Sequence, residues 1–303
     1  MEQLLGVPKI TSTEGPEVAS AVHKMFEKWS LIEKVQGFVF DTTASNTGRI
    51  KGACTLLEQK LDREVLWLAC RHHIFELVLK AAFEETKLYI SSGPDIVLFK
   101  RFRDSWKNIN TNNIKIYNQD ENLRQILEPH RNVILTFCEE RIKEDFPRDD
   151  YKEFIELVII LLGGNPPGGR RLRQPGAYHQ ARWMAKGIYA LKIYLLREEF
   201  KIRKPEETAL RRTCTFIARV YIRVWSQSAK TIQAPFNDFL LIRALYEYDD
   251  TGIGKMCLKK FLTHLWYFNE EIILFSLFDE RVAEIERAKT AQVLLQYKTG
   301  ILC

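Results

Sequence analysis

Two short apolar runs near the N-terminus constrain the fold more than any other feature. Residues 34–42 and 63–69 combine aromatic and aliphatic residues with few charges, which predicts two strands. Between them, residues 47–61 show a helical period, with apolar residues on one face at Ile50, Cys54, Leu57 and Leu61. Helical patterns also cover residues 16–31 and 70–85. Strands that alternate with helices in this way predict a small α/β part with a parallel or mixed sheet.

The strand pattern fades after Gly93 and Pro94, and amphipathic helical patterns dominate the rest of the chain. We expect helices over residues 95–106, 122–144 (kinked near Pro129), 151–162, 177–200, 206–229, 236–248 and 254–288. The stretch GGNPPGGRRLRQPG, residues 163–176, is too rich in glycine and proline for regular structure. The predicted fold class is mostly α with a small α/β part, in two domains, 1–93 and 94–303.

The composition argues against a disordered protein and against one that spans a membrane. The chain has 303 residues, of which 46% are hydrophobic and 28% are charged, as in a globular protein rather than a disordered one. No apolar run approaches the roughly 20 residues of a membrane span, and the first residues lack a secretory signal pattern. The six cysteines form no CxxC pair, which favours reduced thiols. We therefore expect an intracellular protein with no membrane partner.

Positive charge is concentrated in one segment, from Arg170 to Lys230. It holds fifteen lysines and arginines and four acidic residues, so its formal net charge is +11. The whole chain has a net charge of +6, and the rest of the chain therefore has a net charge of −5. Such a segment attracts a polyanion because phosphate contacts release counterions. It is also consistent with the solvated faces of long helices, and charge alone leaves both readings open.

The stretch VFDTTASNTG brings Asp41 to the carboxyl end of a predicted strand. Open α/β sheets present ligands there, and a carboxylate can hold a divalent cation when other carboxylates join it. The alternative is structural: Asp41, Thr42 and Ser45 cap the following helix and order the turn. Taken alone, the stretch favours the structural interpretation.

Cys70 and His73 form a C-x2-H motif where the second strand meets a helix. Cysteine and histidine at this spacing can bind zinc, but a zinc site needs four ligands, and no second pair lies at finger spacing. The motif by itself favours a buried thiol and a histidine that bonds within the fold.

Basic and aromatic residues gather around the Gly/Pro-rich stretch. Arg170, Arg171 and Arg173 lie within it, and Arg182 and Trp183 follow. Arginines beside aromatic rings can hold a nucleic-acid backbone and stack an unpaired base. A basic loop next to a core tryptophan would give the same pattern, so the two interpretations stay open.

Glu270 and Glu271 lie in an aromatic-rich helical pattern and are candidates to join Asp41 in a carboxylate cluster. Adjacent residues on a helix point about 100° apart, so at most one of them can face a given site. A surface role is the alternative.

Taken together, the segments FDTTASNTG, GACTLLEQKL, LACRHHIFELVL and HQARWMAKGIY resemble the hAT superfamily of DNA transposases and the transposon-derived proteins related to it. The resemblance implies an RNase H-like core, partial in this chain, interrupted by a large all-α insertion. It also implies a catalytic centre of two aspartates and a glutamate that binds two divalent ions. By position, Asp41 resembles the second aspartate, Cys70 and His73 the active-site-adjacent C-x2-H, and Arg182 and Trp183 the Arg-Trp motif that contacts DNA.

The chain departs from the family pattern at the other two catalytic carboxylates. The segment that follows the first aspartate in the family resembles EQLLGVPK, here at the start of the sequence. Asp279-Glu280-Arg281 lies too early in the sequence to match the family's glutamate. We therefore expect a chain truncated at both ends, with Asp41 as a catalytic remnant. One carboxylate cannot fill the roughly six oxygen sites of a hard cation, so no cofactor is expected.

These features predict a transposable-element-derived protein that is catalytically inactive and binds nucleic acid through the basic helical region. One alternative is an active Mg²⁺- or Mn²⁺-dependent transposase or nuclease in which Glu270, Glu271 or Glu280 replaces the missing glutamate. Another is a helical interaction module without a nucleic-acid role. The expected partners are DNA and copies of this or related transposase chains, with no small-molecule substrate, and the resemblance implies a nuclear location.

Overall fold

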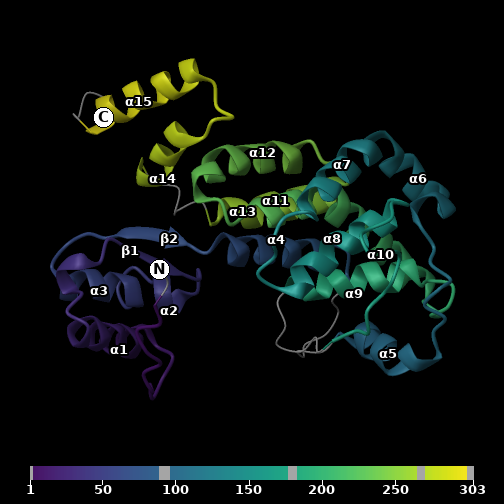
Figure 1. Ribbon diagram of the computed structural model, residues 1–303, viewed down its shortest axis with the longest axis horizontal. Coiled ribbons are helices and arrows are strands. Elements are labelled where there is room, and N and C mark those ends of the chain that lie inside the picture. The colour runs from purple at the N-terminus through teal and green to yellow at the C-terminus, as the bar shows by residue number, and fades with distance from the viewer. Residues whose placement is uncertain (1–2, 89–95, 177–182, 265–269, 299–303) are drawn as a thin grey trace. The chain divides into compact units, whose positions relative to one another are not determined.

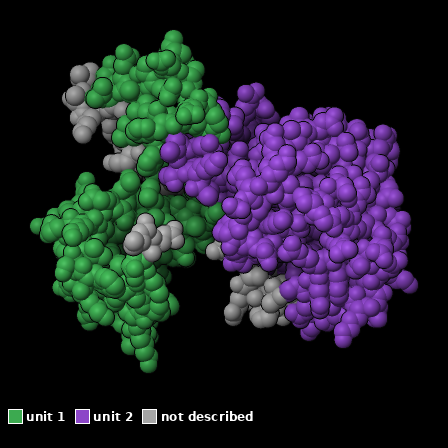
Figure 2. All heavy atoms as spheres, viewed as in Figure 1, with its two compact units in different colours: residues 1–74, 264–303 green, residues 75–263 purple. Residues whose placement is uncertain are grey.

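The computed structural model describes residues 3–88, 96–176, 183–264 and 270–298 (Figure 1). In these residues the chain is mostly helical and holds one two-stranded sheet. It divides into two compact units, unit 1 with residues 1–74 and 264–303 and unit 2 with residues 75–263 (Figure 2). The domain boundary predicted at residue 93 lies outside the described residues.

Unit 1 contains the predicted alternation of helices and strands. Its elements are α1 (Gly15–Lys28), β1 (Gly37–Phe40), α2 (Ala44–Thr47), α3 (Ala53–Leu61), β2 (Leu66–Ala69), α14 (Glu270–Leu274) and α15 (Glu284–Lys298). Strands β1 and β2 pair in parallel, with Phe38 opposite Trp67 and Phe40 opposite Ala69. Helix α3 lies in the connection between them, as a parallel pair requires. The predicted alternation of strands and helices is confirmed, and the sheet, predicted to be parallel or mixed, is parallel.

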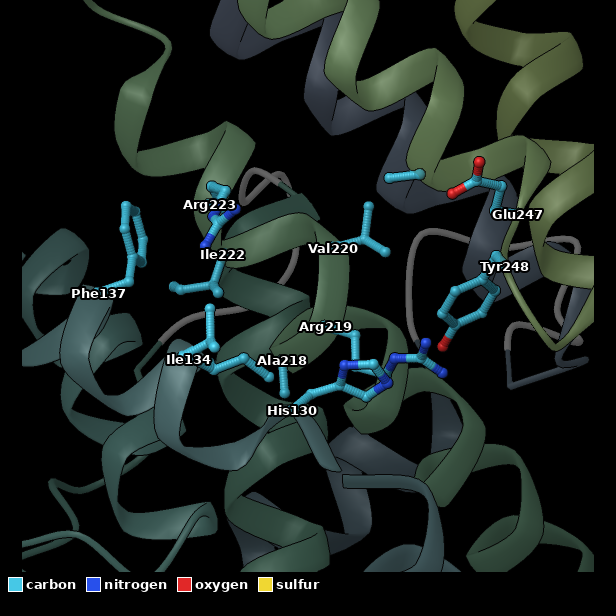
Figure 3. Close-up of a pocket in the computed structure, with 12 residues that line it drawn as sticks. His130, Ile134, Phe137, Ala218, Arg219, Val220, Ile222, Arg223, Glu247 and Tyr248 are labelled. Atoms are coloured by element: carbon cyan, nitrogen blue, oxygen red, sulfur yellow. The ribbon is translucent and has the colours of Figure 1, made fainter. Parts of the chain in front are cut away.

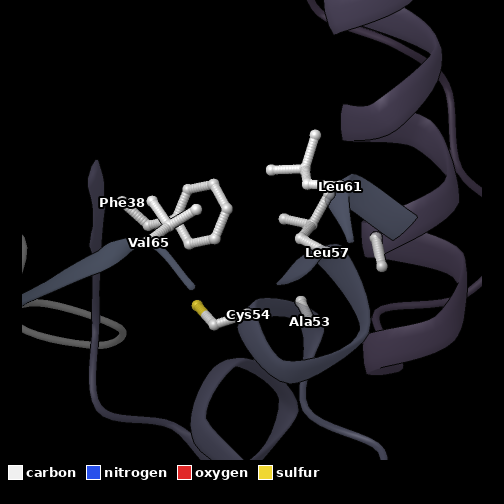
Figure 4. Packing of buried hydrophobic residues seen from close by; sticks show 7 residues of the cluster. Phe38, Ala53, Cys54, Leu57, Leu61 and Val65 are labelled. Atoms are coloured by element: carbon white, nitrogen blue, oxygen red, sulfur yellow. The ribbon is translucent and has the colours of Figure 1, made fainter. Parts of the chain in front are cut away.

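The core of unit 1 lies between α1, α3 and the strands (Figure 4). Its buried residues are Ala19, Phe38, Ala53, Cys54, Leu57, Leu61 and Val65. Glu58 of α3 fixes the start of β2, because its Oε1 accepts hydrogen bonds from the Val65 backbone N–H and the Trp67 indole N–H, each at 2.9 Å. The apolar face predicted for α3 is thus the face that packs, at Cys54, Leu57 and Leu61.

The predicted helix over residues 47–61 is wrong in its first turn, because a glycine turn separates α2 from α3. A Cβ atom on Gly52 would lie 2.4 Å from the Gly48 backbone nitrogen, and one on Gly15 would lie 1.9 Å from the Lys51 carbonyl oxygen. The turn therefore packs backbone to backbone against the start of α1, and only glycine fits. As a result Ile50, predicted on the buried face, is 79% exposed.

Unit 2 is helical in its described residues. Helix α4 (Arg71–Glu85) begins in unit 1 and continues into unit 2, followed by α5 (Val97–Ser105), α6 (Glu121–Leu127), α7 (Arg131–Arg141), α8 (Asp149–Leu161), α9 (Trp183–Leu195), α10 (Lys204–Phe216), α11 (Ile222–Gln227), α12 (Ala234–Tyr246) and α13 (Thr251–Leu262). Helix α9 packs against α8 and α10 in the interior. The kink predicted near Pro129 is confirmed as a 3₁₀ turn between α6 and α7, Glu128–His130.

Two predicted long helices have breaks. The helix predicted over 206–229 contains a π-helical turn, Ile217–Tyr221, between α10 and α11. The helix predicted over 254–288 is wrong as a single element, because α13 ends at Leu262 and α15 begins only at Glu284. Before α15, the Asp279 carboxylate accepts hydrogen bonds from the backbone N–H and the guanidinium of Arg281. An aspartate that bonds to the backbone two residues ahead favours a turn over a helix.

Replacement of Leu57 by alanine tests the packing of unit 1. Leu57 is 5% exposed in the core, so Leu57→Ala should lower the free energy of unfolding by about 3 kcal/mol, from lost burial and the cavity left behind. Val39, on the same sheet but 76% exposed, is the control, and Val39→Ala should cost less than about 1 kcal/mol. Urea unfolding followed by circular dichroism measures both, and equal losses would contradict this core.

Candidate nucleic-acid interface

Asp41 lies at the carboxyl end of β1, where it orders the turn that leads into α2. Its Oδ1 accepts three hydrogen bonds, from the Thr43 backbone N–H at 3.0 Å, the Thr43 hydroxyl at 2.6 Å and the Asn46 side-chain amide at 2.9 Å. The structural interpretation of Asp41 predicted such a turn but named Thr42 and Ser45 as its other members. The observed partners are Thr43 and Asn46.

The turn favours the ionised form of Asp41. Partial burial raises the pKa of this carboxyl, but the hydrogen bonds from Thr43 and Asn46 and the charge of His73 outweigh it, and the pKa lies below its usual 3.8. The side chain is exposed, so solvent screening keeps the associated gain in stability small.

The structure brings Cys70 and His73 to the same end of the sheet as Asp41. The backbone N–H of Cys70 donates to the Phe40 carbonyl at 2.7 Å, and the Cys70 carbonyl accepts from the His73 N–H at 3.0 Å. Cys70 therefore follows β2 as Asp41 follows β1, and it also begins the first turn of α4. Burial raises the pKa of the nearby Cys54 thiol to about 12, so the free thiol is protonated at neutral pH.

The described residues around Asp41 form no carboxylate cluster. Among the described residues, no three His, Cys, Asp or Glu side chains lie close enough together to hold a metal ion. Glu280 is exposed, and the buried Asp279 forms an ion pair with Arg281 at 2.7 Å. The side chains of Glu270 and Glu271 lie outside the described part of the structure.

The Gly/Pro-rich stretch, residues 163–176, forms no helix or strand, as predicted. It is held at several points by contacts with the rest of unit 2. Arg170 binds the end of α8, where its guanidinium donates to the carbonyls of Gly164 at 2.9 Å and Gly163 at 2.6 Å. Arg173 lies 3.5 Å from the Glu156 carboxylate. We call this stretch the basic loop.

A buried lysine holds the middle of the basic loop in place. Lys192 of α9 is 1% exposed, its ammonium lies 2.7 Å from the Glu153 carboxylate of α8, and it donates to the Arg173 carbonyl at 2.9 Å. Burial lowers the Lys192 pKa, and the Glu153 charge opposes that shift. Tyr189, one turn earlier on α9, donates to the Gly176 carbonyl.

Arg171 differs from the other two arginines of the basic loop. Its side chain is exposed and forms no hydrogen bond or ion pair with any described residue. The anchored backbone thus presents one uncompensated guanidinium to solvent. Arg182 and the Trp183 side chain, also predicted to contact nucleic acid, lie outside the described part of the structure.

Many other cations of the basic segment are already paired with acids from elsewhere in unit 2. Arg211 contacts Asp120 at 3.2 Å, and Arg212 contacts Asp250 at 2.6 Å. Five exposed cations have no ion pair with a described residue: Arg171, Lys201, Lys204, Arg223 and Lys230. The open cationic surface is therefore smaller than the sequence count of fifteen indicates.

Sequence reasoning did not identify Lys192, Glu153 and Tyr189, which position the basic loop. A sequence signal was present: Lys192 interrupts the apolar run GIYALKIYL, and Glu153 precedes the apolar run FIELVIIL. A lysine within a buried helix face needs a carboxylate partner. The pattern could indicate the pairing, but not which carbonyl the ammonium would reach.

Comparison with protein-family models, with curated proteins and with solved structures found no match. The resemblance to hAT transposases therefore rests on the motifs alone and stays a prediction. None of the helices in the described ranges is long and apolar enough to cross a membrane.

The charge of Asp41 should contribute to stability only above acidic pH. Because the folded pKa is lowered, the contribution is present above the unfolded value, about pH 4, and is lost as pH falls through the folded pKa. Asp41→Asn keeps a hydrogen-bond acceptor and removes the charge, so it should cost about 0.5 kcal/mol at neutral pH and nothing near pH 2. Urea unfolding at both pH values measures the difference. Selective stabilisation of the wild-type chain by Mg²⁺ or Mn²⁺ would contradict a purely structural Asp41.

Loss of the Lys192 ammonium should destabilise unit 2. Lys192→Met leaves the Glu153 carboxylate without its cation, which should lower the free energy of unfolding by about 3–5 kcal/mol. The double variant Lys192→Met/Glu153→Met should recover most of this loss, because a well-packed apolar pair replaces a buried ion pair at little cost. Both variants should speed tryptic cleavage after Arg170 and Arg171, and unchanged cleavage would show that the loop is held by other contacts.

Proposed function

We propose that this chain is a catalytically inactive relative of the hAT transposases and that it binds nucleic acid through unit 2. The single observation that carries the nucleic-acid proposal is the anchored basic loop with Arg171, which is exposed and has no ion pair with a described residue. A cation on an already ordered backbone loses little conformational freedom when it meets a phosphate. The proposal includes a nuclear location for the protein and a partial RNase H-like ancestry for unit 1. The parallel β1–α3–β2 arrangement supports the ancestry.

The charge of the two units favours unit 2 as the binding part. By sequence, unit 2 holds 32 lysines and arginines and 24 acidic residues, a formal net charge of +8, whereas unit 1 holds 13 and 15, a net charge of −2. A long-range field of this sign favours association with a polyanion. The five exposed cations without an ion pair to a described residue set the expected number of phosphate contacts. If each neutralises one phosphate, the logarithm of the binding constant should fall with the logarithm of salt concentration with a slope of about −4.5.

The surroundings of Asp41 support the proposed lack of catalytic activity. The two-metal mechanism that the resemblance implies needs several carboxylates to hold both metal ions at the phosphodiester. The described carboxylates do not supply such a cluster, and Oδ1 of Asp41 is already engaged by Thr43 and Asn46. Under this proposal Asp41 serves the turn that joins β1 to α2.

The test is binding of a labelled DNA hairpin to the full chain, followed by fluorescence anisotropy between about 50 and 200 mM salt. Arg171→Ala should weaken binding and make the salt slope less negative by about 0.9, the share of one phosphate contact. Arg124→Ala is the matched control, because Arg124 is exposed on α6 of the same unit but pairs with Glu121 at 2.8 Å. The control should leave affinity and slope nearly unchanged.

Two results would contradict the proposal. Absence of binding at the lowest salt concentration would leave a helical interaction module as the better interpretation. Equal effects of Arg171→Ala and Arg124→Ala would show that binding depends on overall charge and not on the basic loop. Circular dichroism of each variant excludes loss of folding as the cause.

A further inference from the structure

Unit 2 contains a cavity of about 280 Å³ that is separate from the residues that form the basic loop (Figure 3). It lies between the start of α7, the π-helical turn, α11 and the residues that follow α12. Three successive residues of the π-helical turn, Ala218, Arg219 and Val220, line it. A π-helical turn displaces side chains from their α-helical directions and is frequent at functional sites.

One end of the cavity carries an uncompensated cation on an aromatic ring. The Arg223 guanidinium lies 5.2 Å from the centre of the Phe137 ring, and the two side chains lie together in Figure 3. Arg223 is exposed and has no ion pair with a described residue. An arginine held against a ring keeps its N–H donors available for an oxyanion.

The other end holds the polar side chains of Arg219 and His130. The Arg219 side chain is 14% exposed, forms an ion pair with Asp249, and lies 5.2 Å from the centre of the Tyr248 ring. Burial lowers the His130 pKa, and the nearby Arg219 charge lowers it further. His130 is therefore mostly neutral at pH 7 and offers one hydrogen-bond donor and one acceptor.

Apolar side chains form the wall between the two ends. Ile134 of α7 and Ile222 of α11 line this part of the cavity with Ala218. Glu247 also lines the cavity, but its carboxylate is bound by the Arg243 guanidinium at 3.0 Å. The cavity thus combines a cationic end, an apolar middle and a neutral hydrogen-bonding end.

We propose that this cavity binds a nucleoside monophosphate group, with the phosphate at Arg223, the flat base against the apolar wall and the polar edge of the base near His130. A volume of about 280 Å³ lies at the lower limit for ligand pockets, so it accommodates one nucleotide and not a longer chain. The same chemistry is presented by a free mononucleotide and by an unpaired nucleotide of a nucleic acid. The site uses other residues than the basic loop and does not depend on the function proposed above.

The test is calorimetric titration of the full chain with three probes: adenosine monophosphate, adenosine and inorganic phosphate. Adenosine monophosphate should bind at least about ten times more tightly than either fragment, since it alone engages both ends. Arg223→Gln should weaken its binding about tenfold or more, because it removes a charge-assisted contact. Lys230→Gln is the matched control, since Lys230 is exposed in the same unit, has no ion pair with a described residue and does not line the cavity.

A second variant tests the cavity without a change of charge. Ala218→Met fills the space beside the apolar wall and should abolish binding of adenosine monophosphate. A dissociation constant above about 1 mM for this nucleotide, or equal weakening of its binding by Arg223→Gln and Lys230→Gln, would overturn the proposal. Inorganic phosphate binding as tightly as the nucleotide would overturn it too.

Competition between adenosine monophosphate and the DNA hairpin shows whether the cavity takes a free nucleotide or an unpaired nucleotide of a nucleic acid. If adenosine monophosphate leaves the Arg171-dependent binding of the DNA hairpin unchanged, the cavity takes a free nucleotide. If it displaces the hairpin, and Arg223→Gln prevents this displacement, the cavity takes a nucleotide of the bound strand. Displacement that Arg223→Gln does not alter would overturn the assignment to this cavity. Titration with adenosine monophosphate alone tests the cavity even if the hairpin does not bind to the chain.

Discussion

The arrangement of unit 2 depends on the buried ammonium of Lys192. It joins α9 to Glu153 of α8 and to the Arg173 carbonyl in the basic loop. A buried lysine without such partners would be unfavourable, because desolvation penalises its charged form. The need to satisfy one charge therefore fixes two helices and a loop relative to each other. Tyr189 adds a second attachment from the same helix.

The same requirement to satisfy charges explains why the basic segment is not an open cationic surface. Asp120 illustrates the point, because it accepts from the Tyr194 hydroxyl at 2.6 Å, pairs with Arg211 at 3.2 Å and caps α6 through the Leu123 N–H at 3.1 Å. One carboxylate thus joins three helices and neutralises a cation. In the described part of the chain, a small set of exposed side chains without an ion pair remains for a polyanion, and Arg171 presents such a side chain from an anchored loop.

The sequence predicted most elements where the periodicity was local and strong. Strands β1 and β2 and the α3 connection followed from apolar runs, and the kink at Pro129 followed from proline chemistry. The break before α3 was missed because it packs against Gly15 at the start of α1, which is distant in the sequence and lies against the Ser45 and Lys51 carbonyl oxygens. The helix predicted over 254–288 was interrupted at Asp279 because its carboxylate bonds locally to Arg281.

The sequence by itself determined the mostly helical fold with a small parallel sheet, the irregular basic loop and the placement of Asp41 at a strand end. Periodicity and turn chemistry are local properties, so the order of residues was sufficient. Only the tertiary structure decided which charges remain available. Arg170 and Arg173 have partners and Arg171 has none among the described residues, although all three lie within four positions. That difference depends on which carbonyls and carboxylates the fold brings within reach, and the spacing of the arginines holds no information about it.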